Sequence, residues 1–574
     1  MMANKWELMP AADADFINNN PEYDKIILQL LFNRRLKEKK EIDEFFNPDK
    51  NNLHDPFLFK DMAAAVALVI KHIKAQDVIV IYGDYDADGV TATAVLVEVL
   101  NIFKAKTAVY IPARVTEGYG LNKKAIDWLA KEKQAKLIIT VDNGIRNKRE
   151  VEYAKGAGLD IIVTDHHEVP PDAADWPDCL IVNPKADNYP FKYLAGVGVA
   201  FKLAKALIET CKLDEKLKAR LEEKILDLAA IGTVADMMSL KSENRILVHL
   251  GLEVLNRGKR LGINELIKAA QINNGREIKA FNIGWQIAPR LNSAGRLDHA
   301  NTAYELLITK DKDEAAAIAE KLNEKNSARQ KITEDIFARA KKIVEGGMKD
   351  DKILIVAAPG VFEDNGELWP EGVIGLVAGR LCEAYSRPAM VITGFNQEIK
   401  GSGRSIDEFN LIAAIEQASE YLERYGGHAA ACGVSFKSLK DLSAFSGKIK
   451  RLAAAALAGA ELTPKILIEA EIDLSDINDE LAQALEKFEP FGEDNERPKF
   501  LSRGLTIIDK VIMGAAAQHV KLRFGSVWAV AFSQAENYKD FKIGGKVDAV
   551  YYLEFNEFNG RKAVQMKIVD IKRN

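Results

Sequence analysis

Three aspartates alternate along the segment VIVIYGDYDADGVTATAVL (78–96): Asp84, Asp86 and Asp88 follow an apolar run, and a glycine comes directly after them. A cluster of Asp and Gly after a strand often forms a turn, because Asx side chains hydrogen-bond their own backbone and glycine tolerates positive φ. A calcium loop of the EF-hand type is excluded, because its twelfth position must be Glu and here it is Val95. This segment alone leaves a turn and a divalent-metal site as alternatives.

Similar polar residues follow three more apolar segments. LIITVDNG ends on Asp142, IIVTDHHE ends on Asp165, His166 and His167, and IGTVADMMSL contains Asp236. We read each of these segments as the end of a strand. Since the carboxyl ends of parallel strands share one edge of a sheet, where ligands bind, these side chains are predicted to meet there.

A cluster of carboxylates like this one is stabilised by bound cations. Several unpaired carboxylates in one crevice repel one another, and burial adds to the cost unless cations compensate. Asp and His together, without thiolates, suit Mn²⁺ or Mg²⁺, and imidazole favours Mn²⁺. Adjacent histidines can also be core or capping residues. Because His166 and His167 lie directly behind an aspartate at a strand end, we favour the metal-site interpretation.

The elements that must position these residues form an alternating pattern between about residue 60 and residue 240. Segments of helical period such as TATAVLVEVLNIFKA separate apolar runs rich in β-branched residues, namely DVIVIYG, TAVYIPA, KLIITVD, LDIIVTD and CLIVNP. Continuous apolar runs of this kind predict a parallel sheet covered by helices on both faces, which is a doubly wound α/β fold.

The rest of the chain changes character twice. Residues 312–346 are rich in Ala, Glu and Lys and predict one long helix that joins two lobes. A second α/β segment follows, and after the Ala-rich stretch IKRLAAAALAGAEL mostly short strands with glycine turns predict a small barrel or sandwich. We therefore expect an N-terminal extension (1–50), a first α/β domain (51–311), a connecting helix (312–346), a second α/β domain (347–461) and a C-terminal β domain (462–574).

Composition sets outer limits on the function. The chain has 574 residues, of which 48% are hydrophobic and 28% charged, as expected for a globular protein of three or four domains. No apolar stretch approaches the roughly 20 residues of a membrane span, and the N-terminus lacks a signal-peptide core, so we expect a cytoplasmic protein without membrane contact. The net charge of −5 argues against bulk nucleic-acid binding, although carboxylates that hold cations count fully in that total. The four cysteines are far apart, which gives no support to a zinc ribbon or a disulfide framework.

The motifs DYDADG, VDNG, DHH and VADMMSL, in this order, resemble the four motifs of the DHH phosphoesterase family. Farther along, IAPRLNSAGRL (287–297), GSGRS (401–405) and GGHAAACG (426–433) resemble the RecJ branch of that family and its DHHA1 domain, and FEPFGEDNERPKF resembles the opening of its OB-fold. The resemblance covers nearly the whole chain from residue 50 onward. It implies a DHH domain, a DHHA1 domain and an OB-like barrel, and a metal-dependent 5′→3′ exonuclease that degrades single-stranded DNA to mononucleotides in DNA repair and recombination.

The resemblance also implies roles for the clustered residues. Two divalent ions, Mn²⁺ or Mg²⁺, would be bound with Asp142 as the bridge, and His167 would face the scissile phosphate. Asp84 would support the cluster or act as a ligand itself. The remaining implied ligands are Asp86, Asp88, His166 and Asp236.

Arginines carry the argument for a phosphate-containing substrate. Arg290 and Arg296 are read as part of a loop with Asn292, and Arg404 as part of a glycine-rich turn beside Ser402. A single arginine is usually a solvated surface group. A guanidinium beside small residues and free backbone N–H groups instead suits phosphate oxygens.

By resemblance, Arg296 would contact the scissile phosphate, with Arg290 and Asn292 also in the substrate site. Arg114, Ser402 and Arg404 would hold a 5′-terminal phosphate. Gly427 and His428 would line the cleft from the second lobe, although a glycine turn before a helix remains an alternative for their neighbours. In the C-terminal β domain most aromatic residues should be core, and a minority facing outward could stack on bases.

One position departs from the family pattern. Where the family usually has a Trp-His pair before Gly-Val-Ile-Gly, this chain has Pro370 in place of the histidine, which puts that residue's part in strand handling in doubt. The first alternative function is a DHH phosphodiesterase for short oligoribonucleotides or cyclic dinucleotides, but the additional β domain favours a longer polymer. The second is a replication scaffold that has lost catalysis, but no metal ligand is missing. The family alone implies a helicase and a single-strand-binding protein as partners, and we expect a monomer.

Overall fold

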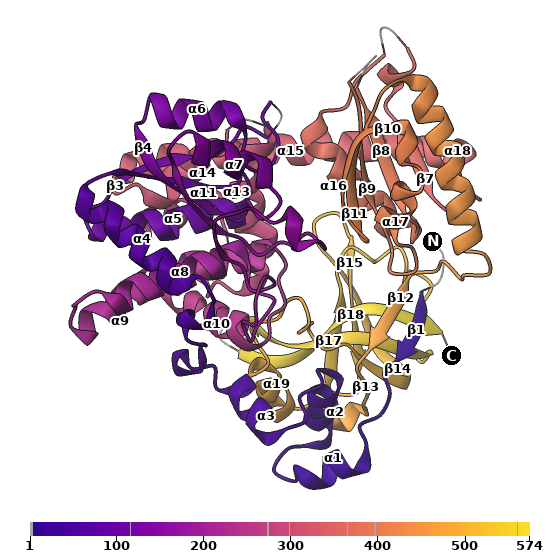
Figure 1. The fold of residues 1–574 in the computed structure, drawn as a ribbon. Coiled ribbons are helices and arrows are strands. Elements are labelled where there is room, and N and C mark those ends of the chain that lie inside the picture. Colours follow the sequence, from indigo (N-terminus) through magenta and orange to yellow (C-terminus); the bar gives the residue numbers. More distant parts are fainter. Residues whose placement is uncertain are drawn as a thin grey trace.

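The computed structural model describes residues 4–114, 116–272, 275–297, 299–363, 366–394, 398–558 and 561–573. The chain folds into a first lobe (residues 56–308), a second lobe (354–456) and a C-terminal barrel (465–573), arranged around a common centre (Figure 1). Each has its own buried apolar cluster.

The first lobe is built on a five-stranded parallel sheet with the order β3-β2-β4-β5-β6. Every apolar run predicted to be a strand is one, and the central strands are almost completely buried, as β-branched residues in a covered sheet should be. The strands are β2 (Val78–Tyr82), β3 (Lys106–Tyr110), β4 (Ala135–Val141), β5 (Asp160–Thr164) and β6 (Leu180–Val182).

Helices cover both faces of this sheet, so the doubly wound prediction is confirmed. Along β2, Ile79 and Ile81 pack into the larger cluster with α4 (Met62–Ala75), α5 (Ala87–Ile102) and α8 (Gly196–Thr210). The alternate residues Val80 and Tyr82 face α6 (Lys123–Lys131) and α7 (Lys148–Gly156). This alternation follows from the two-residue period of a strand.

The segment around Arg290 and Arg296 is helical, so the prediction of a loop there is wrong. Pro, Asn, Ser and Gly lower the helix propensity of APRLNSAGRL. The buried Ile287, Leu291 and Ala294 nevertheless recur at helical spacing, and their packing outweighs that propensity. The remaining helices of the lobe are α9 (Glu215–Ala235), α10 (Ser242–Asn256), α11 (Leu261–Ala269), α12 (Ala280–Asn282), a π-helical turn (Ile283–Ile287), α13 (Ala288–Leu297) and α14 (Asn301–Ile308).

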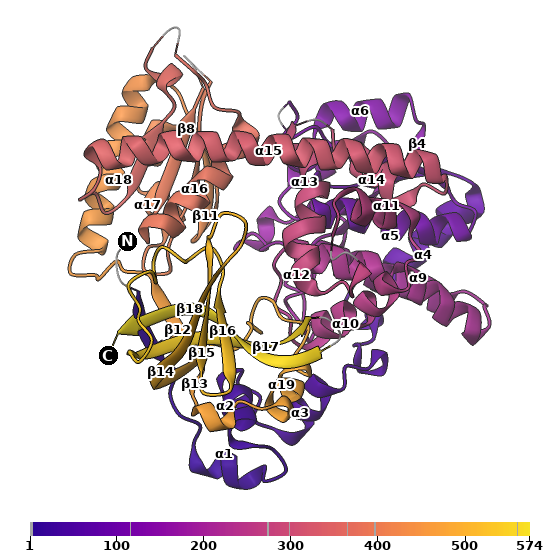
Figure 2. The ribbon, with the colours of Figure 1, turned by 180° about the vertical axis from the view of Figure 1, so that it is seen from behind.

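A single helix, α15 (Lys312–Gly347), connects the first two lobes, as predicted (Figure 2). Asp311 caps its N-terminus by accepting hydrogen bonds from the backbone of Asp313 and Glu314. Ala319 and Leu322 belong to the core of the first lobe, whereas Ile336, Ala340 and Val344 belong to that of the second. Among the described residues, no helix combines the length and the apolar character needed to span a membrane.

The second lobe has a mixed sheet with the order β10-β11-β9-β8-β7. Arg404 is the last residue of strand β9 (Ile399–Arg404) and is not part of a turn, and Gly427 and His428 lie on strand β10 (Leu422–His428). The expected alternative of a glycine turn before a helix is therefore wrong: GGHAAACG forms an antiparallel hairpin. The other elements are β7 (Leu354–Ala357), β8 (Ala389–Thr393), β11 (Ala431–Phe436), α16 (Glu371–Tyr385), α17 (Leu411–Glu416) and α18 (Leu439–Ala456).

The C-terminal β domain is a closed barrel, because β14 pairs with both β15 and β17. Three of its strands are long, since β14 has 14 residues and β17 and β18 have 13 each, whereas the other four described strands of this segment are short, as expected. Closing a small barrel needs strongly bent strands, and register shifts along β14 and β17 show where they bend. The strands are β14 (Phe500–Met513), β15 (His519–Phe524), β16 (Val527–Ala531), β17 (Lys546–Phe558) and β18 (Arg561–Arg573).

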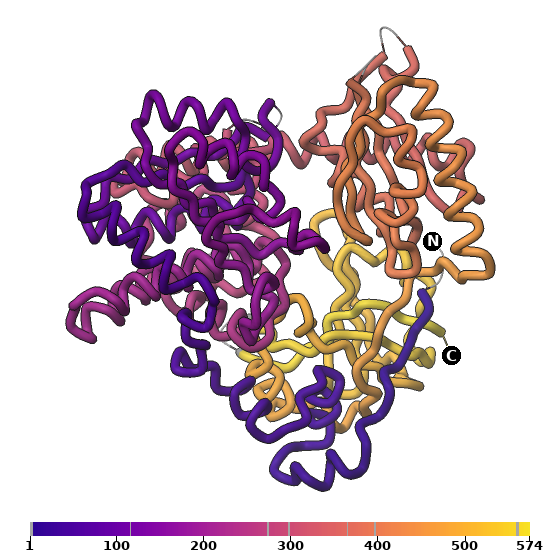
Figure 3. Tube along the Cα trace, in the orientation of Figure 1, coloured from indigo at the N-terminus to yellow at the C-terminus, as the bar shows by residue number. Residues whose placement is uncertain are grey.

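The N-terminal segment packs on this barrel, which the sequence did not predict. Strand β1 (Lys5–Leu8) pairs in parallel with β12 (Lys465–Ile468). Trp6 Nε1 donates to Asp570 Oδ2 at 2.8 Å, so the two ends of the chain lie close together (Figure 3). Helices α2 (Lys25–Asn33) and α3 (Lys39–Phe46) bury their apolar faces in the barrel core. The buried guanidinium of Arg34 forms an ion pair of 2.6 Å with Glu469. Arg245 of α10 donates to the backbone carbonyls of Phe45 and Phe488, which ties the first lobe to this unit.

Candidate metal centre and phosphate-binding site

The three alternating aspartates lie between the end of β2 and the start of α5. Asp86 is the N-cap of α5 and accepts a hydrogen bond from the backbone N–H of Gly89. Asp84 and Asp88 are almost completely buried. The turn and metal-site interpretations are therefore compatible: the backbone turns here, and its carboxylates point into a shared site.

Helix α8 begins at this site and holds Asp88. The carboxylate of Asp88 accepts hydrogen bonds from the backbone N–H groups of Gly196 and Val197, at 2.7 and 2.8 Å. These N–H groups at the helix N-terminus stabilise negative charge. A Cβ at Gly196 would lie 2.6 Å from that of Asp142, so only glycine lets α8 come this close. Sequence reasoning missed Gly196, although the run AGVGVA contained the signal.

Asp142, His166 and Asp236 converge from different elements. Asp142 follows β4 and His166 follows β5, and the Nε2 atom of His166 lies 3.1 Å from Asp142 Oδ1. The same nitrogen lies 3.5 Å from Asp236 Oδ2 and 3.9 Å from Asp88 Oδ2. Asp236 is the C-cap of helix α9, so the reading of that segment as a strand end is wrong, although its carboxylate reaches the predicted edge of the sheet.

Asp165 positions the second histidine. Its Oδ1 atom lies 2.8 Å from Nδ1 of His167 and accepts hydrogen bonds from the backbone N–H groups of His166 and His167. Its other oxygen accepts from the N–H of Ile145. The hydroxyl of Tyr119 lies 3.1 Å from the same Nδ1 of His167. These contacts fix the ring, whose side chain is 44% exposed and accessible to a ligand.

The buried groups of this site interact unfavourably with one another. Burial, followed by repulsion from neighbouring aspartates, raises the pKa of Asp88 to about 7 and raises the pKa of Asp84, Asp142 and Asp236 well above the ordinary range. Burial lowers the pKa of His166 to about 3, which keeps its imidazole neutral and able to act as a ligand. A positive charge at the centre would relieve each of these effects.

The histidine and aspartate beside the centre form a different kind of pair. Burial opposes charge on both groups, but their mutual hydrogen bond and attraction outweigh it. The hydrogen bond and the attraction lower the pKa of Asp165 to about 2 and raise the pKa of His167 above its ordinary value of 6.5. The pair is therefore suited to keep a proton on His167.

The donor set fits divalent cations. Ligand atoms lie within 4.8 Å of one another in three overlapping groups, which share Asp142 and His166. Asp84 Oδ1, Asp142 Oδ1 and both ring nitrogens of His166 are buried without a hydrogen-bond partner. Buried polar atoms of this kind normally have partners, so their common orientation indicates ions. The groups are Asp84–Asp86–Asp142, Asp88–His166–Asp236 and Asp142–His166–His167.

Arginines approach the centre from both lobes. On α13, the guanidinium of Arg296 donates to the carbonyl of Gly372 at the start of α16, at 3.0 Å, while its Nε is buried without a partner. Burial and the nearby charges of Arg114 and Arg329 lower the pKa of Arg296 to about 9. Arg114 itself lies over the ring of Tyr85, 4.9 Å from its centroid. Such a group of cations stabilises an anion between them.

On the second lobe, Ser402 and Arg404 share one face of β9. Glycines of α16 make room for them: a Cβ at Gly375 would lie 2.9 Å from Ser402 Oγ and 3.6 Å from Arg404 Nη2. Ser402 pairs with Gly433, which pairs with Gly426, and a Cβ on either glycine would meet open space. The result is a flat, open floor beside a serine hydroxyl and a guanidinium.

The other predicted substrate residues are restrained by contacts within the protein. Arg290 donates to the side chain of Asn323 and to the carbonyl of Gln286. Asn292 uses its oxygen to accept from the backbone N–H of Ala87, so it caps α5. His428 lies at the open end of β10, and burial and the charge of Arg404 lower its pKa.

Two further features lie close to these residues. Gly427 has a φ of 143°, and a Cβ there would lie 2.2 Å from the carbonyl oxygen of Ala431, so this position of β10 requires glycine. Arg329 on α15 was missed by the sequence reasoning, because nothing marks it within a charged helix. Its Nε is buried without a partner, and burial and Arg290 lower its pKa.

The outer face of the barrel carries cations beside an aromatic ring. Lys521 Nζ lies 4.5 Å, and the Arg523 guanidinium 5.7 Å, from the ring centroid of Trp528. Along β15 these residues alternate with buried Val520, Leu522 and Phe524. Most of the aromatics are core, as expected, and Trp528 belongs to the outward minority.

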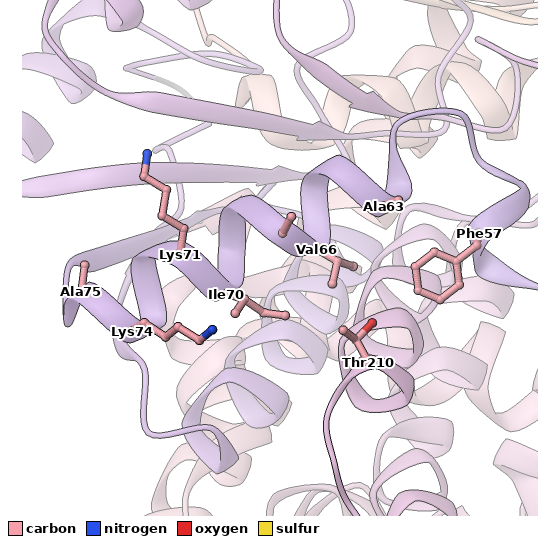
Figure 4. Close-up of a pocket in the computed structure, with 9 residues that line it drawn as sticks. Phe57, Ala63, Val66, Ile70, Lys71, Lys74, Ala75 and Thr210 are labelled. Atoms are coloured by element: carbon pink, nitrogen blue, oxygen red, sulfur yellow. The ribbon is translucent and has the colours of Figure 1, made fainter.

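A shallow groove elsewhere on the first lobe has a different chemistry. It runs along α4 between Phe57 and Ala75 and is floored by Val66 and Ile70, with Lys71 and Lys74 at its rim (Figure 4). Its nine lining residues include no carboxylate or histidine. The groove therefore offers no metal ligands, unlike the edge of the sheet, where the carboxylates and histidines cluster.

Models of three protein domains match the chain. The DHH family N-terminal domain matches residues 78–233, the DHHA1 domain matches residues 350–455, and the RecJ OB domain matches residues 468–570. The first match contains five of the six clustered acidic and histidine ligand candidates, and the second contains Ser402 and Arg404. Asp236 lies just beyond the first match.

Similar whole proteins share the same name. The chain is 36% identical to the single-stranded-DNA-specific exonuclease RecJ of Bacillus subtilis, over 99% of this chain and 71% of that protein. It is 31% identical to RecJ of Escherichia coli, over 88% of this chain and 89% of that one. The crystal structure of RecJ from Thermus thermophilus in complex with Mn²⁺ superposes with a TM-score of 0.82 and 27% identity, over 99% of this chain and 80% of that one. A Mg²⁺ complex of the same protein gives a TM-score of 0.77 at 26% identity, with 99% and 78% covered.

Proposed function

Because the chain belongs to the RecJ family, we propose that it is a metal-dependent exonuclease that hydrolyses single-stranded DNA from the 5′ end to mononucleotides. The observation that carries the proposal is the complete set of buried and half-buried carboxylates, with a buried imidazole, at the sheet edge, which faces arginines from both lobes. The scaffold alternative lacks support, since a scaffold has no need of unpartnered buried ligands.

Two Mn²⁺ or Mg²⁺ ions would be held by Asp84, Asp86, Asp88, Asp142, His166 and Asp236, with Asp142 shared between them. RecJ of Thermus thermophilus is known in complex with each of these metals. When bound, such a pair of ions supplies an activated water and neutralises charge on the phosphate and on the leaving oxygen.

The chain's own residues orient the phosphate. His167, held through Nδ1 by Asp165, keeps a proton that its other nitrogen presents to the scissile phosphate or to the leaving 3′ oxygen. Arg296 holds a non-bridging phosphate oxygen with its unpartnered Nε–H. Its bond to the Gly372 carbonyl makes this contact depend on the second lobe. Arg290 and Asn292 support the same helix.

The 5′ end would bind between the lobes. Arg404, Ser402 and Arg114 hold the terminal phosphate, and the open glycine floor with Gly427 and His428 accommodates the first nucleotide. Hydrolysis between the first and second nucleotides leaves a 5′ phosphate on the shortened strand. The same pocket therefore recognises the product of each cycle as the next substrate.

The outer face of the barrel suits a longer substrate. Lys521, Arg523 and Trp528 suit a longer single strand, with cations along the backbone and a ring for stacking. We assign the DHH domain to residues 51–311, the connecting helix to 312–346, the DHHA1 domain to 347–461 and the OB-fold to 462–574. The protein acts as a cytoplasmic monomer, with a helicase and a single-strand-binding protein as partners in DNA repair and recombination.

Digestion of end-labelled oligonucleotides tests the proposal. With Mn²⁺, a 5′-labelled single strand should release labelled mononucleotide at once, whereas a 3′-labelled strand should shorten progressively. Duplex DNA and RNA of the same sequence serve as controls and should be resistant. Rapid cleavage of short RNA with little activity on long DNA would support the oligoribonucleotide phosphodiesterase instead.

A further inference from the structure

Two exposed aromatic rings lie on the helix that carries Arg296. From Ala280 to Leu297, α12, the π-helical turn and α13 form one continuous helical segment. Phe281 is 64% exposed and Trp285 is 72% exposed, and their rings stack with centroids 6.1 Å apart and an interplanar angle of 27°. Single exposed apolar side chains are common, whereas exposed apolar groups that lie together are a feature of binding surfaces.

The pair shares one side of the helix with the substrate residues. The positions 281, 285, 289, 292 and 296 follow one another at steps of three or four, whereas the buried Ile287, Leu291 and Ala294 face the core. Trp285 itself lies within the π-helical turn, and such turns are frequent at functional sites. Arg296 lies eleven positions beyond Trp285, which is about 16 Å along a helix.

Neighbouring elements place the pair between the metal centre and the barrel. A Cβ at Gly284 would lie 3.5 Å from Val234, two residues before Asp236, so the π-helical turn packs against the end of α9. The ammonium of Lys279 lies 2.8 Å from Glu489 of the barrel segment. Figure 2 shows α12 between α13 and the barrel strand β17. Single-stranded DNA that passes from the metal centre toward the barrel would therefore meet these rings.

We propose that Phe281 and Trp285 are a stacking platform for the bases of single-stranded DNA on the 3′ side of the scissile phosphate. The inference rests on the proposed function, because it takes its occupant from the phosphate-binding face that continues into Arg296. Bases of any sequence can stack on aromatic rings, which suits an enzyme that moves along its substrate. The platform would hold the strand in register while each terminal nucleotide is removed.

The test replaces both Phe281 and Trp285 with alanine, which these exposed positions should tolerate. The control is Trp128→Ala, which removes a half-exposed tryptophan on the opposite face of the sheet. In a chain silenced by Asp142→Asn, affinity for a long single-stranded oligonucleotide should fall about 5- to 150-fold per lost stacking partner. The slope of log K against log salt should not change, because no phosphate contact is lost. Tryptophan quenching by the oligonucleotide should weaken in Trp285→Phe, although its affinity should be largely retained.

Dinucleotide hydrolysis separates the two proposals. A dinucleotide at Arg296 does not reach the rings, so the double variant in the active chain should hydrolyse it like the wild type while losing kcat/KM on long strands. A wild type that hydrolyses neither substrate would refute the proposed function. An active wild type with unchanged long-strand binding in the double variant would refute the platform. If the double variant instead lost concentration-dependent self-association, the rings would belong to a contact between two copies and the platform would again be refuted.

Discussion

The metal centre and the arginine-lined site differ in how they are built. The carboxylates and histidines come from one lobe, at the ends of β2, β4, β5 and α9, and they are largely buried. The arginines come from the first lobe, from α15 and from the second lobe, and β10 beside them is exposed. The first site is a rigid cluster that needs cations, whereas the second is an open surface whose geometry depends on the way α15 joins the lobes.

This difference predicts different consequences of mutation. A ligand shared between two ions cannot be replaced by its neighbours, so its loss should remove the chemistry altogether. A phosphate contact is one of several on an open surface, so its loss should change which substrate is preferred.

Asp142→Ala should abolish hydrolysis without unfolding the protein. Asp142 belongs to two of the three ligand groups, so its loss should cost more than the 10²–10⁴-fold typical of a single general base. Removing a buried carboxylate whose pKa is raised should not lower the stability of the metal-free fold. Turnover with Mn²⁺ and the melting temperature are the two measurements, and Asp350→Ala at an exposed position is the control. Substantial residual turnover would show that Asp142 is not shared between ions.

Mn²⁺ should stabilise the protein, and more strongly as the pH rises. The metal-free fold binds more protons than the unfolded chain wherever the pKa of an aspartate is raised from 3.8. Its stability therefore falls as the pH rises from about 4 through the raised value of about 7 for Asp88. A cation replaces those protons, and at one hundred times its dissociation constant it contributes about 2.7 kcal/mol.

Melting temperatures with Mn²⁺ and with EDTA, measured at pH 6 and pH 8, check this expectation. The difference between them should be larger at pH 8 and should be nearly absent in Asp142→Ala. A difference that shrank with pH would mean that protonated carboxylates do not compete with the metal.

The metal centre could be predicted from the sequence because its residues follow apolar runs directly. The period of the runs fixes the sheet, and the sheet fixes where Asp142 and His166 lie. The second site could not be predicted in the same way. Arg296 and Arg404 are more than 100 residues apart, and only the packing of α16 against β9 and α13 brings them together.

Local propensity also misled the reading of the arginine segments. Glycine-rich sequence suggested turns at GSGRS and GGHAAACG. Instead, Gly401 and Gly403 leave room for buried side chains of the second lobe, and Gly426 and Gly433 leave an open sheet face. The docking of residues 5–46 on the barrel had no sequence signal, because an amphipathic helix does not reveal which surface it will cover. Pro370 lies two residues before Gly372, so the departure from the family pattern falls beside the contact between Arg296 and the second lobe.

Arg404→Ala should change the preference for the 5′ end of the substrate and leave the hydrolytic chemistry intact. A charge-assisted contact to phosphate contributes about 1.5–3 kcal/mol, which is roughly 10- to 150-fold in kcat/KM. The preference for 5′-phosphorylated over 5′-hydroxyl DNA should fall by that factor, while Mn²⁺-dependent cleavage of the 5′-hydroxyl strand persists. Arg451→Ala, at an exposed position on α18, is the matched control. An unchanged preference would place the 5′ pocket elsewhere.

The smallest effect concerns the barrel, which extends the open surface away from the metal centre. Deleting it would be a poor test, because the deletion would uncover the apolar faces of α2 and α3 and leave the guanidinium of Arg34 without Glu469. Replacing both Lys521 and Arg523 with alanine keeps the fold and removes two cations beside Trp528. Each neutralised phosphate on a single strand adds roughly −0.7 to the slope of log K against log salt, so the slope for long DNA should become shallower by about 1.4.

Affinity for long strands should fall at low salt, while hydrolysis of a dinucleotide should stay unchanged, because the metal centre does not depend on this surface. A variant with alanine at Lys136 and Arg451, two exposed cations on the first and second lobes, corrects for the change in net charge. Equal slopes for the barrel variant and the wild type would show that the strand leaves the metal centre by another path, and the open surface would then end at the second lobe.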